Sequence, residues 1–222
     1  MADAGNGRPR RLSREVILDA GLRIVDEAGI EALTMRRLAA DLQVNPMSIY
    51  HHLPGKAAVL AGLVERVYAQ LRVDVPPDGT PWQDQVRAAA QAYRRILRAH
   101  PNLALQIISD PAAVAESLAV AGEPLYAALA QAGLPPRAVV DAANTVVDFV
   151  HGFLLGETRS GGEPFDLGPD LLERVAALPQ GSAPTLTAVA EAVGADGFRF
   201  EYDRGFEVSL DILIRGIEAG LR

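Results

Sequence analysis

Several kinds of chemistry are excluded because the residues that they require are missing. The chain has no cysteine, which rules out disulfides, cysteine ligands for metals and cysteine nucleophiles. It also has no Gly-rich phosphate loop, no G-x-S-x-G motif and no H-E-x-x-H motif. His100 and His151 with scattered carboxylates are too weak a constellation to indicate a reaction. The sequence therefore disfavours an enzyme, and we expect no cofactor and no metal.

Long apolar segments are missing as well. No uninterrupted apolar run approaches the roughly 20 residues that a membrane-spanning helix needs, and the N-terminus lacks the features of a signal peptide. We therefore expect a cytoplasmic protein with no membrane partner. Aromatic residues make up only 5% of the chain, whereas Ala, Leu and Val are abundant. A length of 222 residues suits one large domain, or a small domain followed by a larger one.

Positive charge is scarce overall, but it is unevenly distributed. The formal net charge is −7, which is unusual for a protein that binds DNA. Residues 1–72 nevertheless hold 10 Lys and Arg against 8 Asp and Glu, a balance of +2, whereas residues 73–222 hold 11 against 20, a balance of −9. Affinity for a phosphate backbone depends on local cations, so this asymmetry favours an N-terminal segment that faces DNA.

The segment from Thr34 to Lys56 contains residues that are typical of the starts and ends of two short helices joined by a tight turn. Thr34 can cap a first helix, whose apolar positions recur at helical spacing. These positions are Met35, Leu38, Ala39 and Leu42. Asn45 and Pro46 suit the start of a second helix, which Pro54-Gly55 ends after about two turns. This is the geometry that presents a second helix to the major groove of DNA.

Side chains of the second helix, Pro46 to His52, divide into an inner and an outer set. Ile49 and Leu53 are the expected anchors, because a helix this short must be held by its neighbours. The outer set is Met47, Ser48, Tyr50, His51 and His52. These side chains can reach phosphates or base edges, and Lys56, the only lysine, suits a phosphate. The alternative is an ordinary solvated surface, and a metal at the adjacent histidines is disfavoured because chelating pairs lie three or four residues apart.

The run LTMRRLAADLQVNPMSIYHHLPGKAAVL resembles the N-terminal domain of the TetR family of transcriptional repressors. Twelve positions follow the family's pattern: Thr34, Arg36, Leu38, Ala39, Leu42, Val44, Ser48, Ile49, Tyr50, His52, Leu53 and Lys56. Gln43 departs from this pattern, because the family usually has Gly at the turn. Either the turn is less sharply bent, or Gln43 adopts a conformation that costs roughly a fraction of a kcal/mol. The resemblance and the outer set together predict the DNA contacts. These are Thr34, Arg36, Asn45, Pro46, Met47, Ser48, Tyr50, His51, His52 and Lys56.

The N-terminal domain is expected to span residues 13–72, preceded by a flexible basic arm over residues 1–12. Arg8, Arg10 and Arg11 in the arm can reach the minor groove, or the arm can be a solubilising tail. A supporting helix runs from Ser13 to Gly29, and a linking helix covers residues 55–72. The irregular stretch VDVPPDGTP marks the start of a second domain, residues 73–222.

The second domain contains only helical patterns, which makes the predicted fold all-α. Helices are expected at residues 82–100, 103–109, 113–132, 135–156, 171–178 and 203–221, with a weak pattern at 186–193. Two apolar helices, over 135–156 and at the C-terminus, can form an intersubunit four-helix bundle, or they can be core helices of a monomer. The predicted dimerisation residues are Val139, Val146, Val150, Phe153, Leu210, Leu213 and Ile217.

The resemblance extends through this second domain, where it is nearest to the ligand domain of tetracycline repressors. It rests on PWQDQVRAAAQAYRRILRAHP and FEVSLDILIRGIEAGL. Gln106 and Gly156 stand where the metal-contacting His and Glu of those repressors would be, and Ala89 replaces an Asn that holds the drug. Loss of the His and the carboxylate removes ligands that a magnesium chelate needs, so we expect no response to magnesium-tetracycline.

A small, largely apolar effector is the ligand that the resemblance implies. Polar side chains of the helix over 135–156 can line its cavity or form a solvated edge. The candidate lining residues are Trp82, Tyr93, His100, Gln106, Asn144, Asp148, Phe149 and His151. The resulting hypothesis is a homodimeric repressor that reads a palindromic operator through recognition helices about 34 Å apart and is released by this effector. The alternative is a ligand-independent DNA-binding or protein-interaction protein of the same fold.

Overall fold

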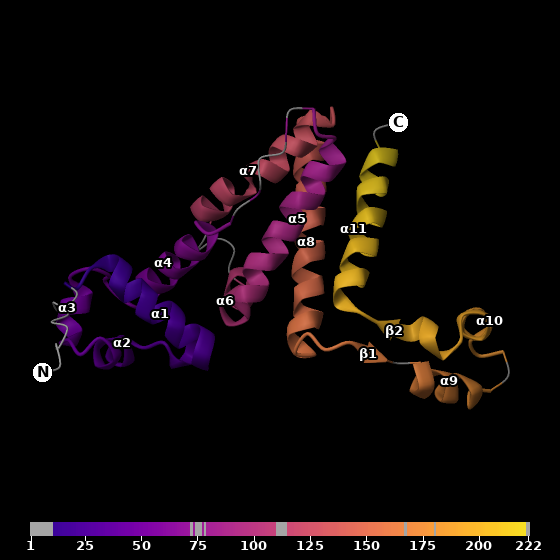
Figure 1. Cartoon of the computed structure of the whole chain (residues 1–222), viewed down its shortest axis with the longest axis horizontal. Helices are drawn as coiled ribbons and strands as arrows, with labels where there is room; N and C mark the ends of the chain where they lie inside the picture. Colours follow the sequence, from indigo (N-terminus) through magenta and orange to yellow (C-terminus); the bar gives the residue numbers. More distant parts are fainter. Residues whose placement is uncertain are drawn as a thin grey trace, which may run out of the picture. The chain divides into compact units, whose positions relative to one another are not determined.

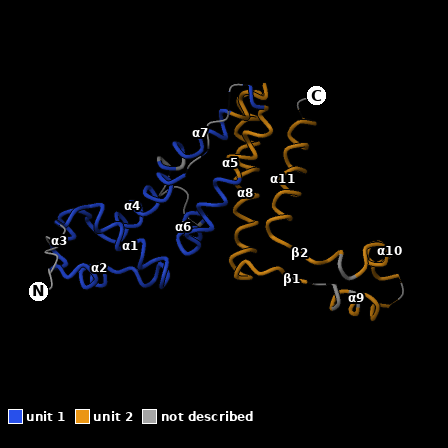
Figure 2. Tube along the Cα trace, viewed as in Figure 1, with its two compact units in different colours: residues 1–80, 91–127 blue, residues 81–90, 128–222 orange. Residues whose placement is uncertain are grey.

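The computed structural model describes residues 11–71, 73, 77, 79–109, 115–166, 168–179 and 181–220. Eleven α-helices lie in these ranges, together with two strands of two residues each, and the prediction of an all-α fold is confirmed. The chain forms two compact units, which Figure 2 colours separately. Unit 1 comprises Met1–Thr80 and Gln91–Ala127, and unit 2 comprises Pro81–Ala90 and Ala128–Arg222. Arg8 and Arg10 of the predicted arm lie outside the described residues.

Unit 1 begins with a supporting pair of helices. Helix α1 (Arg14–Ala28) is capped by the Ser13 hydroxyl, which accepts a hydrogen bond from the Val16 N–H, and it ends at Gly29 with φ of 78°. Helix α4 (Lys56–Tyr68) packs on α1. Both helices contribute fully buried side chains, among them Ile17 of α1 and Leu63 of α4. These two helices form the base on which the shorter helices rest (Figure 1).

The helix-turn-helix is built as its caps predict. In α2 (Met35–Asp41), the Thr34 hydroxyl accepts from the Arg37 N–H at 3.0 Å. In α3 (Pro46–Tyr50), the Asn45 side-chain oxygen accepts from the Met47 N–H at 2.9 Å. Helix α3 is two residues shorter than predicted, because His51 and His52 lie in the turn that follows it. A 3-10 turn, η1 (Ile30–Ala32), connects α1 to α2.

Three further helices complete unit 1 and pass into unit 2. They are α5 (Trp82–Ala99), α6 (Pro101–Ser109) and α7 (Ala115–Gln131). Helix α6 begins at Pro101, two residues earlier than predicted, because proline suits the first helical position and the His100 carbonyl accepts from the Leu103 and Ala104 N–H groups. The first half of α5 and the end of α7 belong to unit 2.

Unit 2 is organised around α8 (Pro136–Arg159) and α11 (Tyr202–Ala219), which lie side by side (Figure 1). An aromatic cluster joins them. Phe149 and Phe153 of α8 lie 5.2 and 5.3 Å, centroid to centroid, from Phe206 of α11. Helix α8 is long and apolar enough to cross a membrane by length and composition, but Val139, Ala143, Val146, Val150 and Leu154 form a buried stripe, as in a core helix.

The segment between α8 and α11 contains an element that the sequence did not predict. Strands β1 (Phe165–Asp166) and β2 (Arg199–Phe200) pair antiparallel, with Phe165 opposite Phe200. Beyond them lie α9 (Gly168–Ala176), α10 (Pro184–Val193) and the 3-10 turn η3 (Ala195–Phe198), which contact one another. A two-residue ladder is too short to leave an alternating pattern in the sequence.

Candidate DNA-reading surface and ligand-domain residues

The recognition helix α3 separates its anchors from its outer side chains as predicted. Ile49 is fully buried and Leu53 is 4% exposed, so both hold α3 to the base of unit 1. Met47 is 61% exposed and Tyr50 is 43% exposed. A large thioether and a phenol on the same short helix therefore face solvent, where base edges and phosphates can meet them. His51 and His52 are also exposed, and Ser48 is half-buried.

Helix α2 adds a second basic surface. Thr34, Arg36, Arg37 and Ala40 line an open hollow at its start. Both arginines are exposed, and no ion-pair partner is recorded for either among the described residues. Arg37 was missed by the sequence analysis, because the family pattern marks Arg36 alone and helical periodicity does not separate two adjacent arginines. The hollow offers two guanidinium groups to a phosphate.

Lys56 has a structural contact that its sequence position did not reveal. Its ammonium group donates a hydrogen bond to the Ile30 carbonyl at 3.0 Å, which ties the start of α4 to η1. An ammonium group has three donors, so this bond leaves two for a phosphate. Lys56 is half-buried, and its stem is held in place rather than free. The contact fixes the position of the cation beside the helix-turn-helix.

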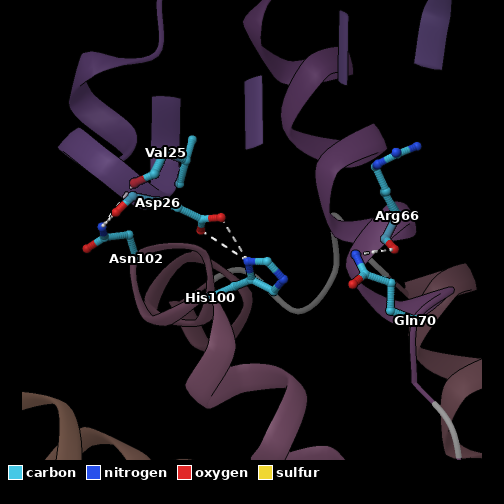
Figure 3. Close-up of polar contacts among 6 residues, drawn as sticks. All are labelled: Val25, Asp26, Arg66, Gln70, His100 and Asn102. Atoms are coloured by element: carbon cyan, nitrogen blue, oxygen red, sulfur yellow. Dashed lines mark hydrogen bonds and ion pairs between the residues drawn. The ribbon is translucent and has the colours of Figure 1, made fainter. Parts of the chain in front are cut away.

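His100 is paired with a carboxylate of unit 1. Its Nδ1 lies 3.0 Å from a carboxylate oxygen of Asp26 at the end of α1 (Figure 3). Asn102 donates from its side-chain amide to the Val25 carbonyl at 2.9 Å and to the Asp26 carbonyl at 3.2 Å. The start of α6 is therefore bound to the end of α1. The partner of His100 lies 74 residues away in the sequence, and no local pattern points to it.

Tyr93 is likewise engaged within unit 1. Its ring stacks on that of Tyr68 with centroids 6.2 Å apart, and the two hydroxyl groups lie 3.2 Å from each other. Burial raises the pKa of both phenols, and for Tyr93 the neighbouring Tyr68 raises it further. Both side chains therefore stay neutral at physiological pH. The pair joins α4 to the second half of α5.

The remaining candidate ligand residues are divided between the two units. Trp82, Asn144, Asp148, Phe149 and His151 belong to unit 2, whereas Tyr93 and His100 belong to unit 1. The side chain of Gln106 lies outside the described part. Asn144 and Asp148 are exposed, so they form the solvated edge of α8 that was the alternative reading. Phe149 belongs to the aromatic cluster.

His151 is a half-buried titratable group of α8 with a clearly shifted pKa. Burial lowers the pKa of its imidazole, and the negative charge of Asp148 opposes that effect only partly. The ring is therefore neutral at pH 7. Within the described ranges, no group of three or more His, Asp or Glu residues is placed to hold a metal ion.

Four of the predicted dimerisation residues are buried inside this chain. Val139, Val146, Val150 and Leu210 are at most 8% exposed, so their side chains pack within unit 2 and are not available to a second copy. Phe153 belongs to the aromatic cluster, and Leu213 and Ile217 are half-buried. The same two helices also carry a set of exposed large apolar side chains. It consists of Val140 on α8 and Val208 and Ile212 on α11, which are 39%, 52% and 67% exposed.

A cleft of about 780 Å³ lies in unit 1 between α4 and α7. None of the predicted ligand residues lines it. Most of its wall residues have small or apolar side chains, which helical periodicity assigns to the general surface rather than to a site. Sequence reasoning therefore missed this cleft. The principal wall residues are Ala58, Ala61, Tyr68, Val120, Ala121 and Pro124.

Comparisons with known proteins agree with this architecture. The family of tetR bacterial regulatory proteins matches residues 17–63, and the tetracyclin repressor-like C-terminal domain matches residues 75–221. An HTH-type transcriptional regulator of Saccharopolyspora erythraea is 33% identical over 147 residues, which cover 66% of this chain and 61% of that protein. The class D tetracycline repressor of Escherichia coli is 27% identical over 213 residues, covering 95% of this chain and 91% of the repressor.

Solved structures lead to the same family. The apo structure of ActR from Streptomyces coelicolor is 28% identical, with a TM-score of 0.79, and the match covers 96% of this chain and 97% of ActR. ActR in complex with actinorhodin gives a TM-score of 0.78 at the same identity, covering 96% of this chain and 99% of ActR. TetR-family proteins are DNA-binding regulators and not enzymes. The chain belongs to the TetR family of transcriptional regulators.

Proposed function

We propose that this protein is a repressor that binds a palindromic operator as a homodimer in the cytoplasm. The main support for the proposal is that α3 has a buried side and an exposed side: Ile49 is fully buried, whereas Met47 and Tyr50 are exposed. The cations of the same surface are Arg36 and Arg37 on α2 and Lys56 at the start of α4. Tyr50 and Met47 are assigned to base edges, and the cations to phosphates.

Homodimerisation is assigned to the exposed face of α8 and α11. Val140, Val208 and Ile212 are large apolar side chains on two adjacent helices, and burying them between two copies is favourable. A twofold dimer also explains how two modules would read the two halves of a palindrome. This face replaces the buried stripe as the assigned interface.

Release by a small molecule is the third part of the proposal. ActR, which has the same fold and similar length, is known in complex with actinorhodin. Magnesium-tetracycline is not the expected effector here, because Gln106 and Gly156 replace the His and Glu that would contact the metal. Release requires that the effector bind more tightly to a conformer in which the spacing between the two helix-turn-helix modules of the dimer does not match the operator.

The test is a titration of the purified protein against fluorescent DNA from the intergenic regions beside its own gene, over a salt series. Unrelated DNA of equal length is the control. The proposal expects a footprint on a palindrome and a logarithm of affinity that falls steeply with the logarithm of salt concentration. A genome-wide selection that recovers no preferred sequence would refute the function.

A further inference from the structure

The cleft between α4 and α7 has the size and composition of a ligand site. Its volume of about 780 Å³ falls within the range of small-molecule sites, roughly 300 to 1,000 Å³. Ala58 and Ala61 line it on α4, and Ala121 faces them from α7. Small side chains on both walls leave space between the two helices. Val120, also in the wall, is 76% exposed, although a valine usually lies inside.

The charged groups of this cleft neutralise one another. Arg14 and Glu65 are its charged wall residues, and their side chains form an ion pair with an N–O distance of 2.6 Å. The hydroxyl of Tyr68, another wall residue, lies 3.2 Å from that of Tyr93. An anionic or cationic ligand would have to compete with the ion pair for its own partner. A neutral and mostly apolar ligand avoids this competition and gains from burial.

A backbone acceptor adds one polar requirement. Pro124 lies inside α7, and proline has no N–H to donate to the carbonyl of the residue four positions earlier, which is Val120. Val120 and Pro124 both line the cleft. The carbonyl oxygen of Val120, a wall residue, therefore has no N–H donor four positions later in the helix. A ligand with a hydroxyl or an N–H group can supply that donor.

We propose that the α4–α7 cleft binds a neutral, mostly apolar molecule that carries one hydroxyl or N–H group, which donates to the Val120 carbonyl. The naming of this molecule as an effector rests on the proposed function, whereas the site itself does not. The cleft is lined by α4, whose first residue is Lys56, so a bound ligand contacts the same helix that positions this cation.

The test uses three probes of one ring system. 1-Naphthol is neutral and has a donor, 1-methoxynaphthalene is neutral without one, and 1-naphthoate is anionic. Binding to the full-length protein is measured by calorimetry or by probe fluorescence. We expect 1-naphthol to bind about three to ten times more tightly than 1-methoxynaphthalene, which is the range of one neutral hydrogen bond. 1-Naphthoate should bind more weakly than both.

Three substitutions, one of them a control, test the site. Ala121→Phe fills the cleft and should weaken 1-naphthol binding at least tenfold, whereas Ala127→Phe, at an exposed position of the same helix outside the cleft, should not. Pro124→Ala restores the helical N–H and favours α7, so this variant should fold. It should bind both neutral probes with nearly equal affinity.

Each outcome decides between site and function. Equal binding of 1-naphthol by the two phenylalanine variants would overturn the cleft as the site. A preference for 1-naphthol that persists in Pro124→Ala would overturn the role of the Val120 carbonyl. The operator titration is run on every variant. Retained operator binding with failed probe binding refutes only this inference, whereas absence of any preferred operator for the unsubstituted protein refutes the proposed function.

Discussion

Two adjacent residues of α3 should respond to alanine substitution in opposite ways. Ile49 is fully buried, so Ile49→Ala removes packed methyl groups and should cost about 2 to 5 kcal/mol of local stability. At about 1.4 kcal/mol per tenfold change, amides of α1 to α4 that exchange through opening of this region should exchange roughly 30 to several thousand times faster. Tyr50→Ala, at a 43% exposed position, should change these rates by less than about threefold.

Operator binding should show the reverse order. Tyr50→Ala should weaken binding by about 1 to 3 kcal/mol if the phenol contacts a base, or by less if it meets only a phosphate. Ile49→Ala should weaken binding only through the fraction of protein in which α3 is displaced. Hydrogen exchange and fluorescence anisotropy on the same samples separate the two effects. Leu178→Ala, with similar exposure in unit 2, is the control.

The reasoning is refuted if Tyr50→Ala destabilises α1 to α4 as much as Ile49→Ala does, or if it leaves operator affinity unchanged. The first result would mean that the phenol is packed in solution. The second would mean that α3 does not present Tyr50 to DNA.

Four further predictions concern single positions. Gln43→Gly should be neutral or stabilising by up to about 1 kcal/mol in hydrogen exchange. A residue other than glycine is strained at φ of 55°, and relief of this strain is partly offset by the greater chain entropy of glycine in the unfolded state. Clear destabilisation would contradict a left-handed turn. Lys56→Ala should lower operator affinity, reduce the salt slope by about one, and loosen η1 through loss of the Ile30 bond; an unchanged slope would exclude a phosphate contact. Ile212→Asp should shift the protein toward monomer in analytical ultracentrifugation, whereas Leu105→Asp should not; an intact dimer would move the interface elsewhere. Because the pKa of His151 is lowered in the folded state, the unfolded chain takes up a proton at higher pH than the folded chain does. The contribution of neutral His151 to stability is therefore full above the ordinary pKa of 6.5 and is lost as the pH falls below that value. His151→Gln should flatten this part of a plot of melting temperature against pH, and a plot parallel to that of the unsubstituted protein would contradict the prediction.

Local sequence signals were enough to predict the helix-turn-helix. Thr34, Asn45 and Pro46 identify helix starts through capping chemistry that depends only on neighbouring residues, and the structure has all three in these roles. The spacing of Ile49 and Leu53 predicted which side chains are inside. The family pattern also marked the turn at Gln43 as a departure, and the structure gives Gln43 a positive φ of 55°.

Signals of partner identity were not present in the sequence. The stripe of Val139, Val146 and Val150 correctly marked an apolar helix face, but periodicity does not say whether the face meets the same chain or a second copy. The structure buries it in the chain and exposes Val140 instead. The same limit applies to His100, whose partner Asp26 comes from a helix far away in the sequence.

Hydrogen bonds and a ring contact connect α1 and α4, the helices that support the helix-turn-helix, to α6 and to the second half of α5. His100 and Asn102 bind the end of α1 to α6, and the pair of Tyr68 and Tyr93 binds α4 to the second half of α5. These bonds are directional, so a displacement of α5 or α6 must either break them or carry α1 and α4 with it. Breaking the contact between the two buried phenol hydroxyls is costly. Under the proposed function, these bonds would transmit a ligand-induced displacement of α6, or of the second half of α5, to α1 and α4.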